Sequence, residues 1–254
     1  MSVSAGRVVV TGASRGIGRA TADAILQNGG RVVAIATDRS RLERLQAAAP
    51  NRVAIVVADL ADTAGLGGVV EAAVEPFDGI DGVVNCAGIA DHQPVGQITP
   101  QAIEHQTRVN VWAPLILGQA FAQHLRDHGG AIVNVSSTLS IRVAPTTTVY
   151  AATKAALNSI TQSLAQELAA YGIRVNAVLP GGVDTDMLRT ANPSEGGVAD
   201  SEIGTRLESV RALHPLARLG TPAEIADVIV GLLDHPWQTG SLVTIDGGLS
   251  IAWG

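Results

Sequence analysis

The sequence predicts a single α/β domain over residues 1–254, with a doubly wound, mostly parallel sheet of seven strands and helices on both faces. Three observations lead to this fold class. Short, mostly apolar segments alternate with longer segments of helical periodicity, without a linker or an internal repeat, which is typical of a parallel sheet covered on both faces. A length of 254 residues suits one such domain. The 28 glycines and an aromatic content of 3% fit tight strand–helix corners and Ala/Val-rich packing.

The individual elements follow from local patterns. The predicted strands are short, mostly apolar and bounded by turn-forming residues: Arg7–Val10, Arg31–Ala36, Val53–Ala58, Gly82–Asn85, Ala131–Ser136, Arg174–Leu179 and Leu242–Ile245. The predicted helices between them are Ile17–Asn28, Arg39–Ala48, Thr63–Glu75, Val111–Arg126, Ala151–Ala170 and Pro222–Leu233. Ligands of such sheets bind outside the carboxyl ends of the strands, so residues that follow strand ends are candidates for a site.

Residues 186–219 form the least regular part of the sequence. This segment is rich in Gly, Ser and charged residues and contains Pro193 and Pro215. We expect it to form a mobile lid over a substrate site, because such segments often have that use. A plain surface excursion is the alternative.

A glycine-rich turn, Gly12 to Gly18, joins the first predicted strand to the first predicted helix. Glycines permit a tight turn and a close approach of the backbone to a ligand, and the helix presents free N–H groups to a phosphate. The spacing G-x-x-x-G-x-G differs from the G-x-G-x-x-G of the common dinucleotide folds, and a plain strand–turn–helix corner is the alternative. The turn favours a dinucleotide site of Rossmann type.

Tyr150 and Lys154 are four residues apart at the start of a helix-like stretch, and on a helix that spacing puts both side chains on one face. A phenol normally loses its proton near pH ~10, and a neighbouring ammonium favours the phenolate and lowers that pKa. The pair is therefore a candidate proton-transfer device. Because Y-x-x-x-K recurs by chance on amphipathic helices, the hypothesis depends on the glycine turn, on Asn110, and on Ser137 thirteen residues upstream of Tyr150.

Six motifs in order give the chain a resemblance to the short-chain dehydrogenase/reductase family, from Val8 to about Gly248. They are Thr11-Gly12 with Gly16-Ile17-Gly18, Asn85-Cys86-Ala87-Gly88, Asn110, Ser137, Tyr150 with Lys154, and Pro180-Gly181-Gly182-Val183-Asp184-Thr185. Cys86 departs from the pattern, because the family more often has a second Asn there, and we expect little consequence. The resemblance implies an NAD(P)-dependent oxidoreductase that interconverts a secondary alcohol and a ketone by hydride transfer.

The resemblance and the chemistry together give Asn110, Ser137, Tyr150 and Lys154 catalytic roles. Tyr150 would exchange a proton with the substrate oxygen, and Lys154 would lower the tyrosine pKa and hold the nicotinamide ribose. Ser137 would bond and polarise the substrate oxygen, and Asn110 would anchor a water leading from Lys154 to solvent. A helix cap is the structural alternative for Asn110. A dinucleotide-sensing protein without turnover is the non-enzyme alternative, but it has no chemical need for all four residues.

The end of the second predicted strand bears on the choice of cofactor. Where NAD-using relatives usually have an acidic residue, this chain has Ala36, and where NADP-using relatives often have a basic one, it has Thr37. Arg15 could contact a 2′-phosphate bidentately, whereas Asp38 could meet the ribose of NAD. We expect NADP, with NAD as the alternative. The resemblance implies a cofactor site of Gly12, Ser14, Arg15, Ile17, Gly18, Thr37, Asp59, Leu60, Asn85, Ala87, Gly88, Tyr150, Lys154, Pro180, Gly181, Val183 and Thr185.

The substrate site is expected to contain Ser137, Leu139, Tyr150, Gly182 and Met187. Apolar and small hydroxyl side chains at 138–148 fit a small, moderately apolar ketone or alcohol, and Arg142 among them is expected to be solvated. Reduction of a 3-oxoacyl group on acyl carrier protein is the alternative. Reductases that serve this acidic carrier tend to have basic residues near the mouth of the active site, at places where this acidic chain has His128 and Tyr171.

Charge and composition argue against several other classes. The net charge of −6 and the pI near 5.4 disfavour nucleic acid and anionic membrane surfaces as partners. No apolar run approaches the ~20 residues of a membrane span, and Met1–Gly6 is no signal peptide. One cysteine excludes an internal disulfide and fits the cytoplasm. The six histidines lack metal-like spacing and are expected at surface or loop positions, so no metal is expected.

The resemblance also implies an oligomer. The predicted helices at 111–126 and 151–170 correspond to the elements that pair subunits in the family, so a homotetramer is expected, with a dimer as the alternative. Trp253, near the C-terminus, is a candidate for a contact near a neighbouring subunit's active site.

Overall fold

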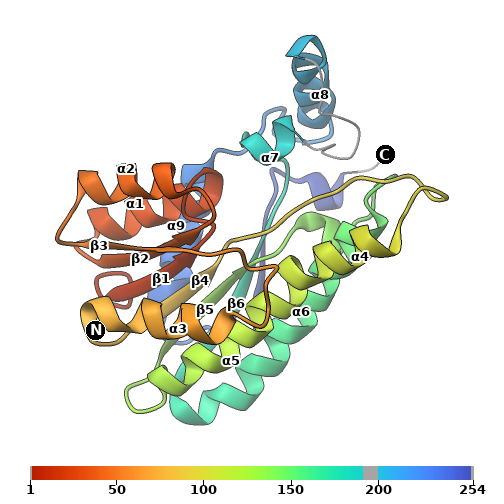
Figure 1. The fold of residues 1–254 in the computed structure, drawn as a ribbon. Coiled ribbons are helices and arrows are strands. Elements are labelled where there is room, and N and C mark those ends of the chain that lie inside the picture. The colour runs from red at the N-terminus through yellow and green to blue at the C-terminus, as the bar shows by residue number, and fades with distance from the viewer. Residues whose placement is uncertain (1, 191–199, 253–254) are drawn as a thin grey trace.

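Seven parallel strands form one sheet in the order β3-β2-β1-β4-β5-β6-β7 in the computed structural model, which describes residues 2–190 and 200–252 (Figure 1). The strands are β1 (Arg7–Thr11), β2 (Arg31–Ala36), β3 (Val53–Val57), β4 (Gly82–Asn85), β5 (Gly130–Val135), β6 (Ile173–Pro180) and β7 (Leu242–Ile245). Each predicted strand is confirmed within two residues at either end. The chain runs outward from β1 to β3 and returns to β4 on the other side of β1, so the strand order reverses between β1 and β4. Ligands of doubly wound sheets bind at such a reversal.

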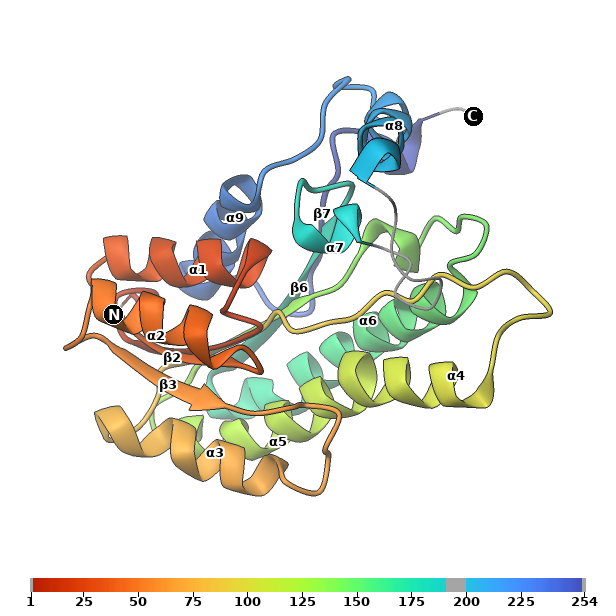
Figure 2. The ribbon, with the colours of Figure 1, turned by 45° about the horizontal axis from the view of Figure 1, so that its top comes forward.

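Helices cover both faces of the sheet (Figure 2). One layer contains α1 (Gly16–Gln27), α2 (Arg39–Ala48) and α9 (Pro222–Asp234), and the other contains α3 (Leu66–Val74), α5 (Ala113–Leu125) and α6 (Thr148–Leu168). Successive side chains of a strand point to opposite faces. Val8 and Val10 therefore pack with the first layer and Val9 packs with the second, which divides the core in two.

Helix α4 (Pro100–Thr107) has no counterpart among the predicted helices. It continues through a π-helical turn, Arg108–Trp112, directly into α5, so the predicted helix at 111–126 is the second part of a longer one. The amphipathic pattern does not indicate α4 because Gln106 is its only buried residue, although Thr99 caps it and Pro100 is its first residue.

Two helices lie in the predicted lid: α7 (Asp186–Arg189) and α8 (Asp200–Ala212). The segment is therefore more regular than its polar composition suggests, and its residues 191–199 lie outside the described residues. Both helices stand beyond the carboxyl ends of the strands, away from the two layers that cover the sheet (Figure 1). Trp253 also lies outside the described residues. Across residues 2–190 and 200–252, no helix combines the length and the apolar character needed to cross a bilayer.

Candidate active site

A cavity of about 670 Å³ opens at the carboxyl ends of the strands. Its floor is formed by residues at or just after the ends of β1, β2, β4, β5 and β6, and Met187 and Leu188 of α7 and Arg206 of α8 line its opposite side. The parallel sheet brings these strand ends to one edge, and the reversal of strand order opens the space between β1 and β4.

The glycine turn is packed too closely for any other residue. Gly12 has φ +67°, and a Cβ there would lie 2.9 Å from the backbone N and Cα of Ala87. A Cβ on Gly18 would lie 2.3 Å from the carbonyl oxygen of Gly12. Thr11 Oγ1 accepts hydrogen bonds from the backbone N–H groups of Cys86 (3.1 Å) and Ala87 (3.0 Å). The turns after β1 and β4 are therefore held against each other.

The start of α1 is suited to a phosphate. Arg15 is the N-cap residue of α1, and its side chain makes no capping hydrogen bond. The first N–H groups of the helix have no intrahelical acceptor, and its first residues, Gly16, Ile17 and Gly18, line the cavity. Together with the close-packed glycines, these groups fit the pyrophosphate of a nicotinamide dinucleotide, whose nicotinamide would supply or accept the hydride.

Ser137, Tyr150 and Lys154 meet at the other end of the cavity. Ser137 follows β5, and α6 carries Tyr150 and Lys154 with the Lys154 Nζ 5.8 Å from the centroid of the Tyr150 ring. Lys154 Nζ donates a hydrogen bond of 2.8 Å to the carbonyl oxygen of Val135. The shared face predicted by the four-residue spacing is present, and β5 supplies Ser137 opposite it.

Burial dominates the protonation of the pair. It raises the pKa of Tyr150 to about 12, against the opposing effect of a hydrogen bond with Ser137. It lowers the pKa of Lys154 to about 8. The Lys154 ammonium lies 5.8 Å from the centroid of the Tyr150 ring, and its expected lowering of the tyrosine pKa stays a prediction. The neutral phenol is the resting form, which suits a group that gives a proton to a substrate oxygen.

Asn110 lies behind Lys154 in the π-helical turn and does not line the cavity. Its Nδ2 donates to the Ile89 carbonyl (2.9 Å) and to Thr153 Oγ1 (3.1 Å), and its Oδ1 accepts from the Ile89 N–H (3.0 Å). A Cβ on Gly88 would lie 3.3 Å from both Asn110 Oδ1 and Lys154 Nζ. The Asn110 side chain thus holds the loop after β4 against α6, which positions Lys154.

Asn85 is also away from the cavity. It is buried, and its Nδ2 donates to Asn134 Oδ1 (2.9 Å), whose own Nδ2 donates to Thr161 Oγ1 (2.8 Å). This chain of amides connects β4, β5 and α6. The other residues expected at the site line the cavity: Gly12, Ser14, Arg15, Ile17, Gly18, Thr37, Asp59, Leu60, Ala87, Gly88, Ser137, Leu139, Tyr150, Lys154, Pro180, Gly181, Gly182, Val183, Thr185 and Met187.

Asp38 is engaged outside the cavity as the N-cap of α2. Its carboxylate accepts from the Arg41 N–H (3.0 Å) and Ser40 Oγ (2.8 Å) and forms an ion pair with Arg41 Nε (3.2 Å). The backbone hydrogen bond from Arg41 is the main reason that the pKa of Asp38 is lowered. Asp59 does line the cavity, and its Oδ1 accepts from the Ala61 N–H at 2.9 Å. Asp59 does not cap a helix, because α3 begins only at Leu66.

Several cavity residues were not found by sequence reasoning. His92, His105, Val210, Leu213, Leu249 and Arg206 come from separate loops and from helices that the pattern did not predict. Arg206 Nε donates to the Leu188 carbonyl at 2.9 Å. Burial, then the positive charge of Arg206, lowers the pKa of His92, so this imidazole is neutral at neutral pH. The substrate end is therefore more polar than residues 138–148 alone suggest.

Two of the polar residues behave in ways that no local pattern indicates, and for Arg142 the expectation needs correction. His214 lies in the loop after α8, as expected, but it is buried there; its Nε2 accepts from the Gly182 N–H at 3.0 Å, which fixes the turn after β6. Arg142, expected in solvent, donates to the carbonyls of Leu249 and of Ala252, the latter at 3.1 Å. These contacts follow from the C-terminal segment folding back over the β5–α6 loop, which no local pattern indicates.

His128 and Tyr171 lie at the wrong edge to flank this cavity. They precede β5 and β6 at the amino ends of those strands, whereas the cavity is at the carboxyl ends. A basic residue is present beside them, because the Arg126 guanidinium lies 4.4 Å from the centroid of the Tyr171 ring. Within one chain, His128 and Tyr171 therefore do not indicate whether the mouth of the cavity is basic or neutral. Among the residues that the structure describes, no cluster of three or more His, Cys, Asp or Glu side chains could hold a metal ion.

Comparisons with known proteins agree with this geometry. A family model described as enoyl-(acyl carrier protein) reductase matches residues 12–250. An uncharacterized oxidoreductase of Methylorubrum extorquens is 39% identical, over 98% of this chain and 100% of its own. The L-xylulose reductase of Caenorhabditis elegans is 34% identical, over 96% of this chain and 95% of its own length. The solved structure of a short-chain dehydrogenase/reductase from Serratia marcescens superposes with a TM-score of 0.87 at 30% identity, covering 98% of this chain and 100% of that one.

Proposed function

The chain belongs to the short-chain dehydrogenase/reductase family. Because relatives that resemble it are named L-xylulose reductase, galactitol 2-dehydrogenase and L-rhamnose 1-dehydrogenase (NAD(P)(+)), we propose that it interconverts a secondary alcohol and a ketone with NADP. The observation that carries the proposal is one cavity with a close-packed glycine turn at one end and Ser137, Tyr150 and Lys154 at the other. A dinucleotide spanning the two ends brings its nicotinamide to the tyrosine.

The residues of the chain then divide the work of the reaction. Tyr150, protonated at neutral pH, gives its proton to the oxygen of the ketone as that oxygen gains charge. Ser137 bonds the same oxygen and stabilises the developing charge. Lys154 has a pKa of about 8, so it is mostly protonated at neutral pH, and it holds a ribose hydroxyl. Its positive charge also stabilises the tyrosinate that forms once the Tyr150 phenol has lost its proton. Alcohol oxidation uses the same groups in reverse.

The ribose end of the cavity supports NADP over NAD. Ala36 and Thr37 line it, and Asp38, the carboxylate that could have received the NAD ribose, is committed to capping α2. Arg15 lines the cavity with its side chain 58% exposed, so a 2′-phosphate can reach it. A guanidinium binds a phosphate bidentately.

Replacing Ala36 by Asp should shift the preference from NADP toward NAD by about tenfold or more, since the new carboxylate repels a 2′-phosphate and accepts hydrogen bonds from ribose hydroxyls. The ratio of the dissociation constants of NADPH and NADH, measured by fluorescence, checks this. Ala36→Asn, of the same size and without charge, is the matched control. An unchanged ratio in the Asp variant would place the ribose elsewhere.

The function itself is tested with the unmodified protein. We expect tight NADPH binding and oxidation of NADPH in the presence of members of a panel of small ketones and ketoses, with the reverse reaction on the corresponding alcohols. A relative named L-xylulose reductase supports including ketoses in the panel. Turnover with NADH instead would keep the reaction and reject NADP. Dinucleotide binding without turnover of any member would favour the sensing protein.

Reduction of a 3-oxoacyl group on acyl carrier protein stays the second candidate. The description of the matching family model favours a carrier-linked substrate. The net charge of −6 opposes it, because the carrier is acidic and like charges disfavour association.

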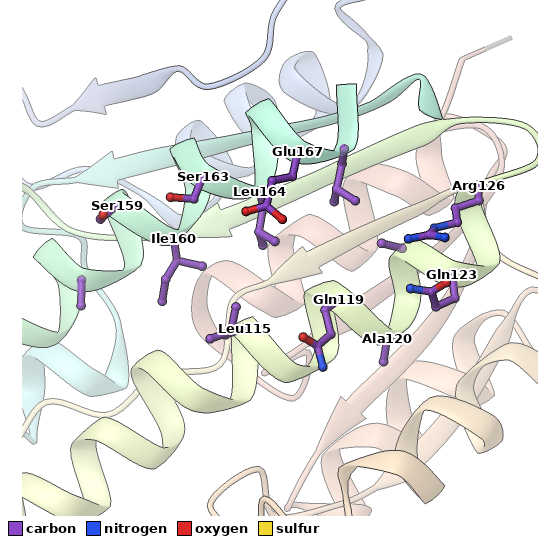
Figure 3. A pocket seen from close by; sticks show the side chains of 13 residues that line it. Leu115, Gln119, Ala120, Gln123, Arg126, Ser159, Ile160, Ser163, Leu164 and Glu167 are labelled. Carbon is purple, nitrogen blue, oxygen red and sulfur yellow. The ribbon is translucent and has the colours of Figure 1, made fainter. Parts of the chain in front are cut away.

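A groove between α5 and α6 supports assembly as a homotetramer, with a dimer as the alternative. The groove has a volume of about 830 Å³ and lies on the outer side of the two helices (Figure 3). Leu115, Ile160 and Leu164 face it, with Gln119 and Glu167 at its border. A mixed apolar and polar surface of this kind suits the same two helices of a second copy.

A further inference from the structure

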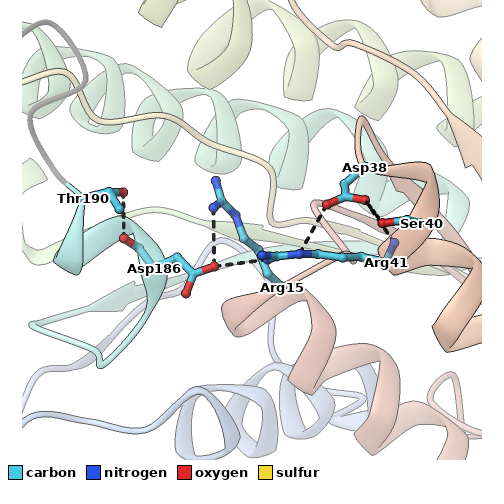
Figure 4. A network of polar contacts seen from close by, with 6 residues as sticks. All are labelled: Arg15, Asp38, Ser40, Arg41, Asp186 and Thr190. Atoms are coloured by element: carbon cyan, nitrogen blue, oxygen red, sulfur yellow. Dashed lines mark hydrogen bonds and ion pairs between the residues drawn. The ribbon is translucent and has the colours of Figure 1, made fainter. Parts of the chain in front are cut away.

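A single carboxylate joins the lid to the nucleotide end of the cavity. Asp186 Oδ2 lies 3.4 Å from Arg15 Nη1 and 3.1 Å from Arg41 Nη1, so the two guanidinium groups share it (Figure 4). Arg15 lies in the glycine turn, Arg41 in the first turn of α2, and Asp186 is the first residue of α7. The Asp186 carboxylate therefore connects the glycine turn, α2 and α7.

The arginines converge beside the end of β2. Arg41 is the third residue of α2, which begins two residues after Thr37. Its Nε is held by Asp38 at 3.2 Å, which aims the rest of the guanidinium at Asp186. Both arginines lower the pKa of Asp186, the hydrogen bond from Arg41 most. Asp186 is thus ionised and occupies the positive potential that two arginines create at the ribose end.

This ion pair is weak enough to be exchanged. The side chains of Arg15, Arg41 and Asp186 are 58%, 37% and 45% exposed, and ion pairs in water contribute less than about 1 kcal/mol each. A phosphate monoester carries nearly two charges and three acceptor oxygens, so it competes favourably with a carboxylate for two guanidinium groups.

We propose that Arg41 is a second arginine for the 2′-phosphate of NADP, beside Arg15, and that Asp186 is an internal anion which this phosphate displaces. The inference rests on the proposed use of NADP. Displacement frees Asp186, the first residue of α7, from its contacts with Arg15 and Arg41. The 2′-phosphate, rather than the nicotinamide, therefore releases α7 from the glycine turn. NAD, which lacks the phosphate, leaves the Asp186 contact in place.

The test uses two nucleotide fragments on the whole chain, 2′,5′-ADP and 5′-AMP, which differ only in the 2′-phosphate and carry no nicotinamide. Calorimetry gives their affinities for the unmodified chain and for the Arg41→Met and Asp186→Asn variants. Arg41→Met should weaken 2′,5′-ADP by about tenfold, and Asp186→Asn should tighten it by about threefold or more, while 5′-AMP stays within about twofold in both. Arg39→Met, on the same helix and, within the described residues, in an ion pair with Glu43 alone at 3.8 Å, is the matched control and should change neither affinity.

Hydrogen exchange at residues 186–190 supplies a second readout. In the unmodified chain, 2′,5′-ADP should speed exchange there and 5′-AMP should not, whereas Asp186→Asn should exchange fast without any nucleotide. Weaker 2′,5′-ADP binding in Asp186→Asn would overturn the competition and make Asp186 an organiser of the arginines. Unchanged binding in Arg41→Met would remove Arg41 from the site. If the unmodified chain shows no preference for 2′,5′-ADP, the NADP assignment itself fails, and turnover with NADH then decides the reaction separately.

Discussion

Replacing Tyr150 by Phe is expected to lower turnover at least about a thousandfold, while the affinity for the nicotinamide nucleotide changes only a few-fold. The variant removes one oxygen from a side chain that is 8% exposed, so the packing of α6 against β5 is kept. It also removes the hydroxyl that, in the proposed mechanism, passes a proton to the substrate oxygen beside Ser137 and Lys154. Steady-state rates with a reactive ketone and nucleotide binding by fluorescence, measured on the same preparation, check both halves.

The chain provides a control of the same chemistry. Its other tyrosine, Tyr171, lies at the amino end of β6 against Arg126, on the far edge of the sheet. Tyr171→Phe should therefore leave turnover within about twofold. Residual activity above about one per cent in Tyr150→Phe would contradict the proposed mechanism, because one general acid is worth a hundredfold or more.

The strands were predictable because their signal is local. A run such as Val8–Val10 is apolar on both faces, since each face packs against helices, and this makes a buried parallel strand recognisable without any knowledge of its neighbours. The same holds for Tyr150 and Lys154, whose spacing alone places them on one face of a helix. The polar helices α4 and α8 carry no such signal.

What the sequence could not provide depends on contacts between distant segments. Asn85 and Ser137 both lie near strand ends, yet one amide turns into the sheet and the other side chain lines the cavity. The contact between Asp186 and Arg41 joins residues 145 positions apart. The pKa of Tyr150 is likewise set by burial, which only the folded chain determines.

Lys154 is the only lysine in the sequence, and the burial of its ammonium in the site destabilises the folded chain. Its pKa is about 8 in the folded chain against an ordinary 10.5, so between these values the unfolded chain binds more protons and the free energy of unfolding rises with pH. Below pH 8 the full penalty for the buried ammonium applies, about 3 kcal/mol for a pKa lowered from 10.5 to about 8. An arginine could not lose its charge in the same way.

The free energy of unfolding of Lys154→Met at pH 7 is therefore expected to be about 2 kcal/mol higher than that of the unmodified chain. This value is the relieved penalty of about 3 kcal/mol less about 1 kcal/mol for the lost hydrogen bond to the Val135 carbonyl. Urea unfolding at pH 7 and near pH 10.5 measures this, and the advantage should shrink at the higher pH because the unmodified lysine is then neutral in both states. Turnover of Lys154→Met should also fall, because the variant lacks the positive charge of the lysine. Because the sequence has one lysine, labelling with ¹³Cε-lysine yields a single NMR signal, and its titration reports this pKa directly. A midpoint near 10.5, or a methionine variant less stable at pH 7, would contradict the account and leave the ammonium as a tolerated rather than a costly group.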